Sequence, residues 1–270
     1  MRPGTLSLRP GEWGERSLRI AILGAGEYWA TLDQPSPVGE GTVAPAEATA
    51  SLQQILRNRL QEEVAAYRSL LGKGATAVYN LPCGGPVIYA GSRDTLSALR
   101  EEYGSSHWTF RFLLLTRGGP PQESIDCDLP VAVHNTEDRS LISHTTGKRA
   151  STRFQRILRG ESLELWEAQT HFLRPDQIRL HAAEVGLSIA GESLYGTHEP
   201  ISRPDLPGNR KPGGRGFVLY PAPAVHLAEL IAPSLSESAF TSEPPKSFIK
   251  WIRANLPQEK DLQSVLNSLS

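Results

Sequence analysis

Two neighbouring stretches of alternating apolar and polar residues constrain most strongly what this chain can fold into. They are "STRFQRIL" (151–158) and "LELWEAQTHF" (163–172), and each alternates with the period of two that is typical of β-strands. Since only a few residues separate them, we expect the two strands to pair. Two more strands are predicted in 18–32 around a turn at Gly24–Gly26, and one in 108–116.

Helical spacing of apolar residues marks the other elements. Leu52 to Leu71 read as one helix, with Ser51 and Gln54 as a possible capping box. Further helices are expected over 94–103, 175–186, 244–255 and 259–269, whereas 117–146 has short strands at most. Because strands and helices do not alternate as regular βαβ units, the fold class is predicted to be α+β with much antiparallel pairing. Residues 1–17 read as a flexible arm and 18–270 as a single domain.

Composition narrows the class of protein. Of the 270 residues, 39% are hydrophobic and 21% charged, as in ordinary globular proteins, and no run is long and apolar enough for a membrane span. The formal net charge of −1 means that any nucleic-acid binding must come from local patches. Cys83 and Cys127 lack a CxxC spacing, which favours a reducing, cytoplasmic location and argues against zinc. The histidine spacing and the glycines at 24–26 and 72–74 predict neither a metal nor a nucleotide site, so no cofactor is expected.

The stretch "VYNLPCGGPVIYAG" (78–91) is the most unusual loop of the chain. It reads as the end of a strand at Tyr79–Leu81, a turn over Pro82–Pro86 and a second strand at Val87–Ala90. A cysteine and two glycines meet in this turn, in a region with few acidic side chains. From the residues alone, Cys83 is either a nucleophile or a buried packing residue.

The segment "LRPDQIRLHAAEVGLSIAGESLYG" (173–196) resembles a motif of the RluA-type RNA pseudouridine synthases, roughly G-R-T-H-Q-I-R-V-H-L-A-x-x-G-x-P-I-x-G-D-x-L-Y-G. Among the positions that differ, Asp176 replaces the His and Glu192 replaces the Asp. Other segments follow in the family's order, among them "YWATLDQPSPV", "FLLLTRG", "TGKRASTRFQRI", "AVHLAEL" and "EPPKSFIKWI", so the resemblance covers about residues 18 to 255. It implies the pseudouridine synthase fold: a bent, mostly antiparallel mixed sheet flanked by helices, with a central cleft.

The resemblance implies a cofactor-free isomerisation of uridine in structured rRNA or tRNA, by an aspartate held against the ribose of a flipped nucleotide. The family's catalytic loop H-R-L-D falls on Tyr79, Asn80, Leu81 and Pro82, so a proline stands where the aspartate belongs. No Asp occurs between Asp33 and Asp94 to replace it. Phe112 stands at the position of the active-site tyrosine. No catalytic residue is therefore assigned, and Cys83 and Glu167 are the substitutes considered.

The resemblance also suggests residues that contact RNA. Phe112, Gln177, Ile178, Arg179 and Leu194 are expected to line the cleft around the base. Arg179 is expected to pair with Glu167, solvent or an RNA phosphate, or simply within the fold.

The RNA backbone is expected on basic residues of one loop and strand and of the 173–196 segment: Lys148, Arg149, Arg153 and Arg174. Arg156 and Arg159 extend this group, and Arg203, Arg210, Lys211 and Arg215 form a second one. Phe154 and Phe217 lie nearby as stacking platforms. The alternative for any one such group is a solvated charged face.

Three hypotheses follow. The first is an RNA-binding protein, monomeric and away from membranes, that has the pseudouridine synthase fold without isomerase activity. The second is an active pseudouridine synthase with a non-standard catalytic group. The third is a protein whose cleft holds a small ligand or a protein partner. The sequence does not indicate which RNA or which uridine is involved.

Overall fold

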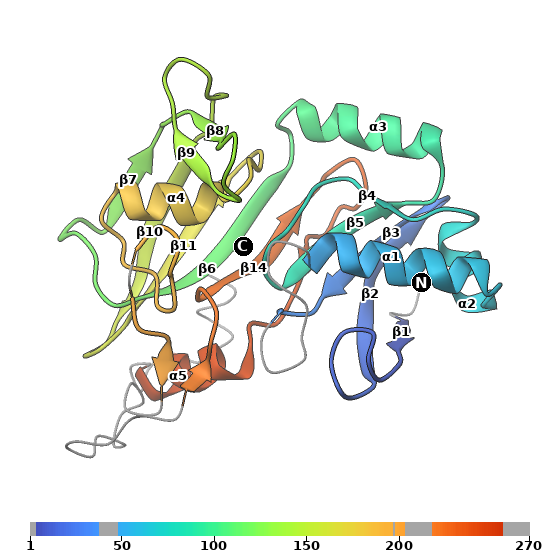
Figure 1. Cartoon of the computed structure of the whole chain (residues 1–270), viewed down its shortest axis with the longest axis horizontal. Coiled ribbons are helices and arrows are strands. Elements are labelled where there is room, and N and C mark those ends of the chain that lie inside the picture. The colour runs from blue at the N-terminus through green and yellow to red at the C-terminus, as the bar shows by residue number, and fades with distance from the viewer. Residues whose placement is uncertain (1–3, 38–47, 197, 203–217, 256–270) are drawn as a thin grey trace. The chain divides into compact units, whose positions relative to one another are not determined.

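The computed structural model describes residues 4–37, 48–196, 198–202 and 218–255 (Figure 1). The chain divides into two compact units, one of Met1–Phe110 with Leu227–Glu243 and the other of Arg111–His226 with Pro244–Ser270. It passes between them within strands β6 (Thr109–Thr116) and β14 (Val225–Ile231). The structure thus has two units where a single domain over 18–270 was predicted, because local periodicity does not report which distant segments share a core.

The first unit is built on a five-stranded sheet of order β1-β2-β3-β5-β4, in which each pair is antiparallel. Its strands are β1 (Thr5–Leu8), β2 (Leu18–Gly26), β3 (Trp29–Gln34), β4 (Thr76–Ala77) and β5 (Gly85–Ala90). Helices α1 (Ala48–Gln61), α2 (Ala65–Leu71) and α3 (Arg93–Gly104) belong to the same unit, as does β15 (Phe240–Thr241), which pairs with β14. The hairpin predicted in 18–32 is present, although its turn lies at Glu27–Tyr28.

Strand β1 corrects the expectation of a flexible arm over residues 1–17. Leu6 and Leu8 are 2% and 1% exposed, and the Tyr67 hydroxyl donates to the Ser7 carbonyl over 2.9 Å. The strand is anchored because its alternate leucines enter the core while its backbone pairs with β2. The alternation of apolar residues in β1 is short and is flanked by prolines and glycines, so the sequence did not predict a strand there.

The long helix predicted from Leu52 to Leu71 is two helices. Glu63 adopts a left-handed conformation, with φ of 57°, between the end of α1 and the start of α2. Since α1 begins at Ala48, Ser51 lies inside the helix and caps nothing, so the predicted capping box is wrong. The helical spacing of apolar residues continues through the break, so the spacing alone does not predict that the helix is interrupted at Glu63.

In the second unit, four strands follow the order β6-β11-β10-β7, with β7 at Ser124–Cys127. β10 (Thr152–Arg159) and β11 (Glu164–Thr170) pair antiparallel, which confirms the pairing predicted from their alternation. The remaining elements are the hairpin of β8 (Val131–Val133) and β9 (Ser140–Ile142), helix α4 (Gln177–Glu184), the pair β12 (Ile201–Ser202) and β13 (Val218–Tyr220), and helix α5 (Lys246–Asn255). The α+β class is confirmed.

The remaining predicted helices are present where the structure describes the chain. α3, α4 and α5 lie where helices were predicted, and Ser92 caps α3. The helix predicted over 259–269 and the basic loop 203–215 fall outside the described residues. Within the described ranges, no helix has the length and hydrophobicity to cross a membrane, and no group of three His, Cys, Asp or Glu side chains is arranged to hold a metal ion.

Candidate functional site

The loop at 78–84 lies in the first unit, between β4 and β5. Tyr79–Leu81 is not a strand, because β4 already ends at Ala77. The Gln34 side-chain amide donates to the carbonyls of Leu81 and Cys83 over 2.8 and 2.7 Å, and the Thr49 hydroxyl donates to the Leu81 carbonyl over 3.0 Å. These bonds satisfy buried backbone groups of the turn and fix its shape.

Glycine closes the loop where β5 begins. The Leu227 N–H donates to the Gly84 carbonyl over 2.9 Å. Gly85 has φ of 135°, and a Cβ there would lie 2.3 Å from the Leu227 carbonyl oxygen. No other residue fits this close approach of two backbones, so the loop is set rigidly against β14.

The side chains of this loop offer little chemistry. Tyr79 is buried among Tyr103, Trp108 and Phe110, and its hydroxyl donates to the Pro86 carbonyl over 2.7 Å. Burial holds the pKa of Tyr79 well above its usual range, so the phenol stays neutral. Asn80 is exposed, and Cys83 is 6% exposed. Pro82 has neither an acid nor a nucleophile.

An acid that the sequence analysis did not consider as a site residue lies next to this loop. Asp33 on β3 is in register with Pro86, and its carboxylate accepts from the Ser242 hydroxyl over 2.6 Å. Burial, with the charge of Glu243, raises the pKa of Asp33 against the effect of that hydrogen bond. Because Gln34 points to the loop, its neighbour Asp33 points to the opposite face of the sheet. The alternation of side chains along β3 could have predicted that Asp33 and Gln34 lie on opposite faces of the sheet.

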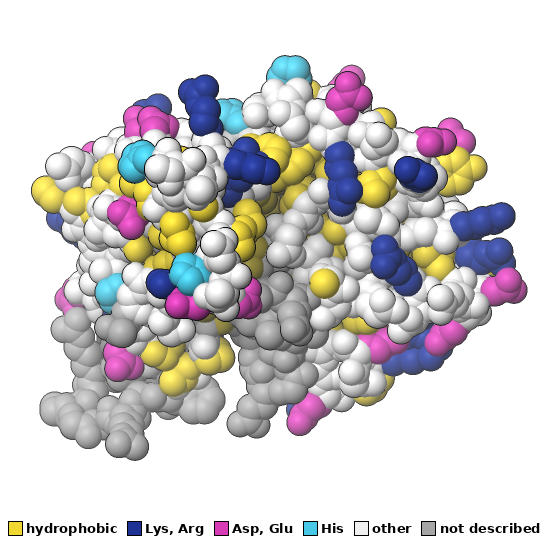
Figure 2. All heavy atoms as spheres, turned by 45° about the horizontal axis from the view of Figure 1, so that its top comes forward, with side chains coloured by type: hydrophobic (Ala, Val, Ile, Leu, Met, Phe, Trp, Pro, Cys, Tyr) yellow, Lys and Arg dark blue, Asp and Glu magenta, His cyan; other side chains and the backbone are white. Residues whose placement is uncertain are grey.

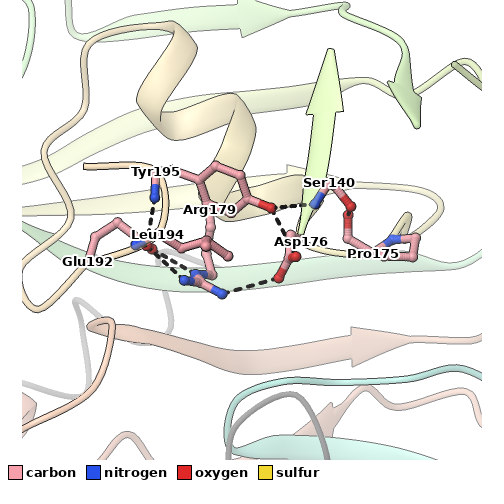
Figure 3. A network of polar contacts seen from close by, with 7 residues as sticks. All are labelled: Ser140, Pro175, Asp176, Arg179, Glu192, Leu194 and Tyr195. Carbon is pink, nitrogen blue, oxygen red and sulfur yellow. Dashed lines mark hydrogen bonds and ion pairs between the residues drawn. The ribbon is translucent and has the colours of Figure 1, made fainter. Parts of the chain in front are cut away.

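In the second unit, Arg179 is the centre of a polar network (Figure 3). Its Nε and one terminal nitrogen donate to the two carboxylate oxygens of Glu192, each over 2.7 Å. The other terminal nitrogen donates to Asp176 over 3.1 Å. This two-bond pairing is the strongest geometry open to an arginine and a carboxylate. Of the alternatives expected for Arg179, pairing within the fold is the one that the structure shows, with Glu192 and Asp176 rather than Glu167 as partners.

Glu192 is built to stay ionised although it is 2% exposed. Burial alone would raise its pKa, but the hydrogen bonds and charge of Arg179 outweigh it and hold the pKa below its ordinary value. The backbone N–H groups of Leu194 and Tyr195 donate to the same carboxylate over 2.7 and 3.1 Å. Burial likewise opposes the charge on Arg179, yet Glu192 and Asp176 keep the pKa of Arg179 above its usual value.

The network extends to the β8–β9 hairpin. The Tyr195 hydroxyl donates to Asp176 over 2.9 Å and accepts from the Ser140 N–H over 2.7 Å, while the Ser140 hydroxyl donates to the Pro175 carbonyl over 2.8 Å (Figure 3). The Arg179 guanidinium carbon lies 5.3 Å from the centre of the Tyr195 ring. Asp176 and Glu192 both differ from the motif that the segment resembles, and both acids hold Arg179.

The other residues expected around a base are packed into the fold. Phe112 is 2% exposed, and Ile178 is also buried. The Gln177 amide donates to the Ser151 carbonyl and the hydroxyls of Thr152 and Thr170, each over 3.0 Å. Among the predicted base contacts, only Leu194 is exposed, at 39%.

The basic residues expected on RNA include one pair in contact and one arginine beside an acid. The Arg174 Nε donates to the Arg149 carbonyl over 3.3 Å, and Lys148 precedes Arg149 in the chain. Arg153 lies on β10, 3.9 Å from Asp126. Figure 2 shows Lys and Arg side chains scattered among acidic ones on the face in view.

The expected aromatic platform is also corrected. Phe154 is fully buried, whereas Phe172, which the sequence analysis did not single out, lies under the guanidinium of Arg174. Phe217 is outside the described residues. Alternation along β10 predicts that Phe154 and Arg153 face opposite sides of the strand, and this could have excluded Phe154.

Comparisons with known proteins agree on the fold. No family model matches the chain. Ribosomal large subunit pseudouridine synthase D of Zymomonas mobilis subsp. mobilis is 25% identical over 113 residues, which are 42% of this chain and 36% of that protein. The alignment thus spans about a third of the curated relative.

Two solved human structures are similar over most of the chain. RNA pseudouridylate synthase domain containing 4 has a TM-score of 0.64 at 15% identity, over 86% of this chain and 92% of that one. RNA pseudouridylate synthase domain containing 1 has a TM-score of 0.59 at 15% identity, over 93% and 94%.

Proposed function

We propose that this chain, which has the pseudouridine synthase fold and resembles the RluA-type enzymes in sequence, binds RNA without converting uridine to pseudouridine. The fold and the relatives' names support RNA as the partner. The exposed residues Lys148 and Arg149, with Arg174 beside them, support a local basic contact in a chain of net charge −1.

One observation carries the loss of activity: Arg179 is saturated by acids of its own segment. Where the resemblance expects this arginine to face a catalytic aspartate, it pairs with Glu192 and Asp176. Pro82 stands at the position of that aspartate and has no group to attack a sugar or accept a proton. The chemistry has lost its carboxylate, and the arginine has taken a place in the fold.

The experiment measures binding and isomerisation separately. The purified chain is incubated with rRNA and tRNA transcripts, pseudouridine is quantified by mass spectrometry, and affinity is measured by filter binding. We expect binding without pseudouridine. In cells, pseudouridine mapping of total RNA with and without the gene is expected to show the same sites.

Other results would favour the other hypotheses. Pseudouridine formation that disappears in Cys83→Ala or Glu167→Gln would identify a substitute catalytic group and overturn the proposal. Failure to bind either transcript would leave a small ligand or a protein as the partner.

A further inference from the structure

We propose that Phe172 and Arg174 form a stacking site for an unpaired nucleotide of RNA, with Lys148 and Arg149 as phosphate contacts. The inference rests on the proposed function, since it assumes that the chain binds RNA. It goes beyond it by naming single-stranded rather than duplex RNA and by placing the contact outside the Arg179 network.

The stack itself is the first observation. The Arg174 guanidinium carbon lies 4.3 Å from the centre of the Phe172 ring, and both residues are half-buried at the surface. A planar cation at this distance covers one face of the ring and offers its own second face to another flat group. Nε donates to the Arg149 carbonyl, while the two terminal nitrogens make no hydrogen bond within the described ranges.

The backbone beneath the stack is held in place. The Arg174 N–H donates to the Gln177 side-chain oxygen over 2.9 Å, and the Thr170 hydroxyl donates to the Phe172 carbonyl over 3.0 Å. Gln177, which is 1% exposed, also donates to Thr170 and so joins the two anchors. Because the platform is ordered before any ligand arrives, little conformational entropy opposes binding.

Positive charge lies beside the stack. Lys148 and Arg149 are exposed, and neither forms an ion pair with any residue that the structure describes. Other surface arginines have acidic partners, among them Arg139 with Glu137, Arg153 with Asp126 and Arg159 with Glu164. Unpaired cations are the ones available to phosphate.

The nearest acid along the chain does not compete for Arg174. Asp176 is two residues away, but its two oxygens accept from Arg179 and Tyr195. The network that holds Arg179 therefore also leaves Arg174 without an acidic neighbour of its own segment.

Stacking selects for unpaired bases. In a duplex the faces of the bases are covered by their neighbours, whereas a single strand can place a base on an aromatic ring or a guanidinium. The site therefore fits one unstacked nucleotide, whose phosphates meet Lys148 and Arg149.

The test compares variants of the full chain on a short fluorescent oligouridine and on an RNA duplex of equal length. Phe172→Leu keeps an apolar side chain and removes the flat ring, and Arg174→Gln removes the planar cation. Each is expected to weaken oligouridine binding by about 5- to 100-fold. Phe172→Trp should retain it, and the matched control Arg68→Gln, a charge loss in the other unit, should change it less than about twofold.

The outcomes separate the two proposals. Unchanged oligouridine affinity in Phe172→Leu, or an equal loss on oligouridine and duplex, would overturn the stacking site while leaving RNA binding intact. If the unmodified chain binds neither RNA, the proposed function fails, and the stacking site fails with it. Thermal melts of each variant establish that a loss of binding is not a loss of fold.

Discussion

Arg179 illustrates at the scale of one residue how a side chain expected at a reaction centre can be held within the fold. A guanidinium that is 15% exposed needs acceptors, because a buried unpaired cation is costly. Glu192 and Asp176 supply them from the same segment of chain, so no group outside it is needed. The charge pair binds the turn at 191–195 to α4.

Removing Glu192 is expected to destabilise the chain strongly. Glu192→Gln leaves Arg179 with Asp176 alone and should lower the free energy of unfolding by about 3 kcal/mol, measured by urea denaturation. The exposed Glu101→Gln on α3 is the control and should change it by less than about 0.5 kcal/mol. Because the folded pKa of Glu192 is lowered, its contribution is present above about pH 4.5 and is lost as the pH falls through the folded pKa. Equal stability of the two variants would contradict this role of Glu192.

An aspartate introduced at Pro82 is not expected to give isomerase activity. In Pro82→Asp the new acid finds Arg179 already bonded to Glu192 and Asp176, so the pairing that the resemblance implies is not available. We expect no pseudouridine from this variant on rRNA or tRNA transcripts by mass spectrometry. Pseudouridine above the level of the unmodified chain would mean that the arginine can exchange partners.

Residue by residue, the sequence predicts identities better than partners. The absence of an acid at Pro82 and the substitutions at Asp176 and Glu192 are evident from the sequence alone. The contact of both substituted acids with Arg179 is not, because it depends on the turn at Gly191 and on the left-handed backbone of Asp176, with φ of 53°. The spacing of apolar residues in the sequence does not predict such backbone turns.

At the scale of elements, α4 is attached to β10 through a buried histidine. His181 Nδ1 lies 2.9 Å from the Thr152 hydroxyl, and Nε2 lies 2.9 Å from the Leu129 carbonyl. Since a carbonyl only accepts, Nε2 carries the proton and Nδ1 accepts from Thr152. Burial lowers the pKa of His181, against the opposing influence of the Leu129 carbonyl and Asp128.

The chain is therefore expected to lose stability as the solution becomes acidic. Below about pH 6.5 His181 binds a proton in the unfolded state but stays neutral in the folded state. Its contribution to the free energy of unfolding is therefore complete above this pH and decreases as the pH falls toward the lower pKa of the folded state. Urea midpoints at about pH 7.5 and about pH 5.5 should differ more for the unmodified chain than for His181→Gln. An identical pH dependence of the two proteins would contradict the assignment.

The break between α1 and α2 offers a second test. Glu63 has φ of 57° and a side chain that is 73% exposed, paired with Arg68 over 3.1 Å. Glu63→Gly removes the cost of a left-handed non-glycine residue and only a weak surface ion pair, so it should stabilise the chain by about 0.5–1 kcal/mol in urea denaturation. Gln54→Gly, at an exposed position in the interior of α1, should instead destabilise it by about 0.5–1 kcal/mol. A loss of stability in Glu63→Gly would show that the carboxylate matters more than the backbone.

Most helices and strands could be predicted from the sequence, but the residues at which they begin and end could not. Alternation predicted the β10–β11 pair, and helical spacing predicted α3, α4 and α5. The spacing failed at Glu63, where two helices share one apolar stripe, and at β1, where the pattern is too short to stand out from its prolines. Tertiary packing decides both cases.

For the whole molecule, a net charge of −1 makes RNA binding a local matter. If Lys148 and Arg149 each neutralise one phosphate, the logarithm of the association constant should fall with that of salt with a slope of about −1.4 for single-stranded RNA. Arg149→Gln should make this slope shallower by about 0.7. Fluorescence anisotropy over a salt series measures both, and a slope near zero would exclude phosphate contacts by these residues.

The path of the chain through β6 and β14 has a consequence for how such a protein changes in evolution. Residues 1–110 lack the segment 227–243, from which Leu227 meets Gly84, Phe240 meets Trp29 with ring centres 6.2 Å apart, and Ser242 meets Asp33. A gene fragment that ends after residue 110 would therefore not encode the complete first unit. Because each unit takes its residues from separate stretches of the gene, the two units are expected to be inherited together.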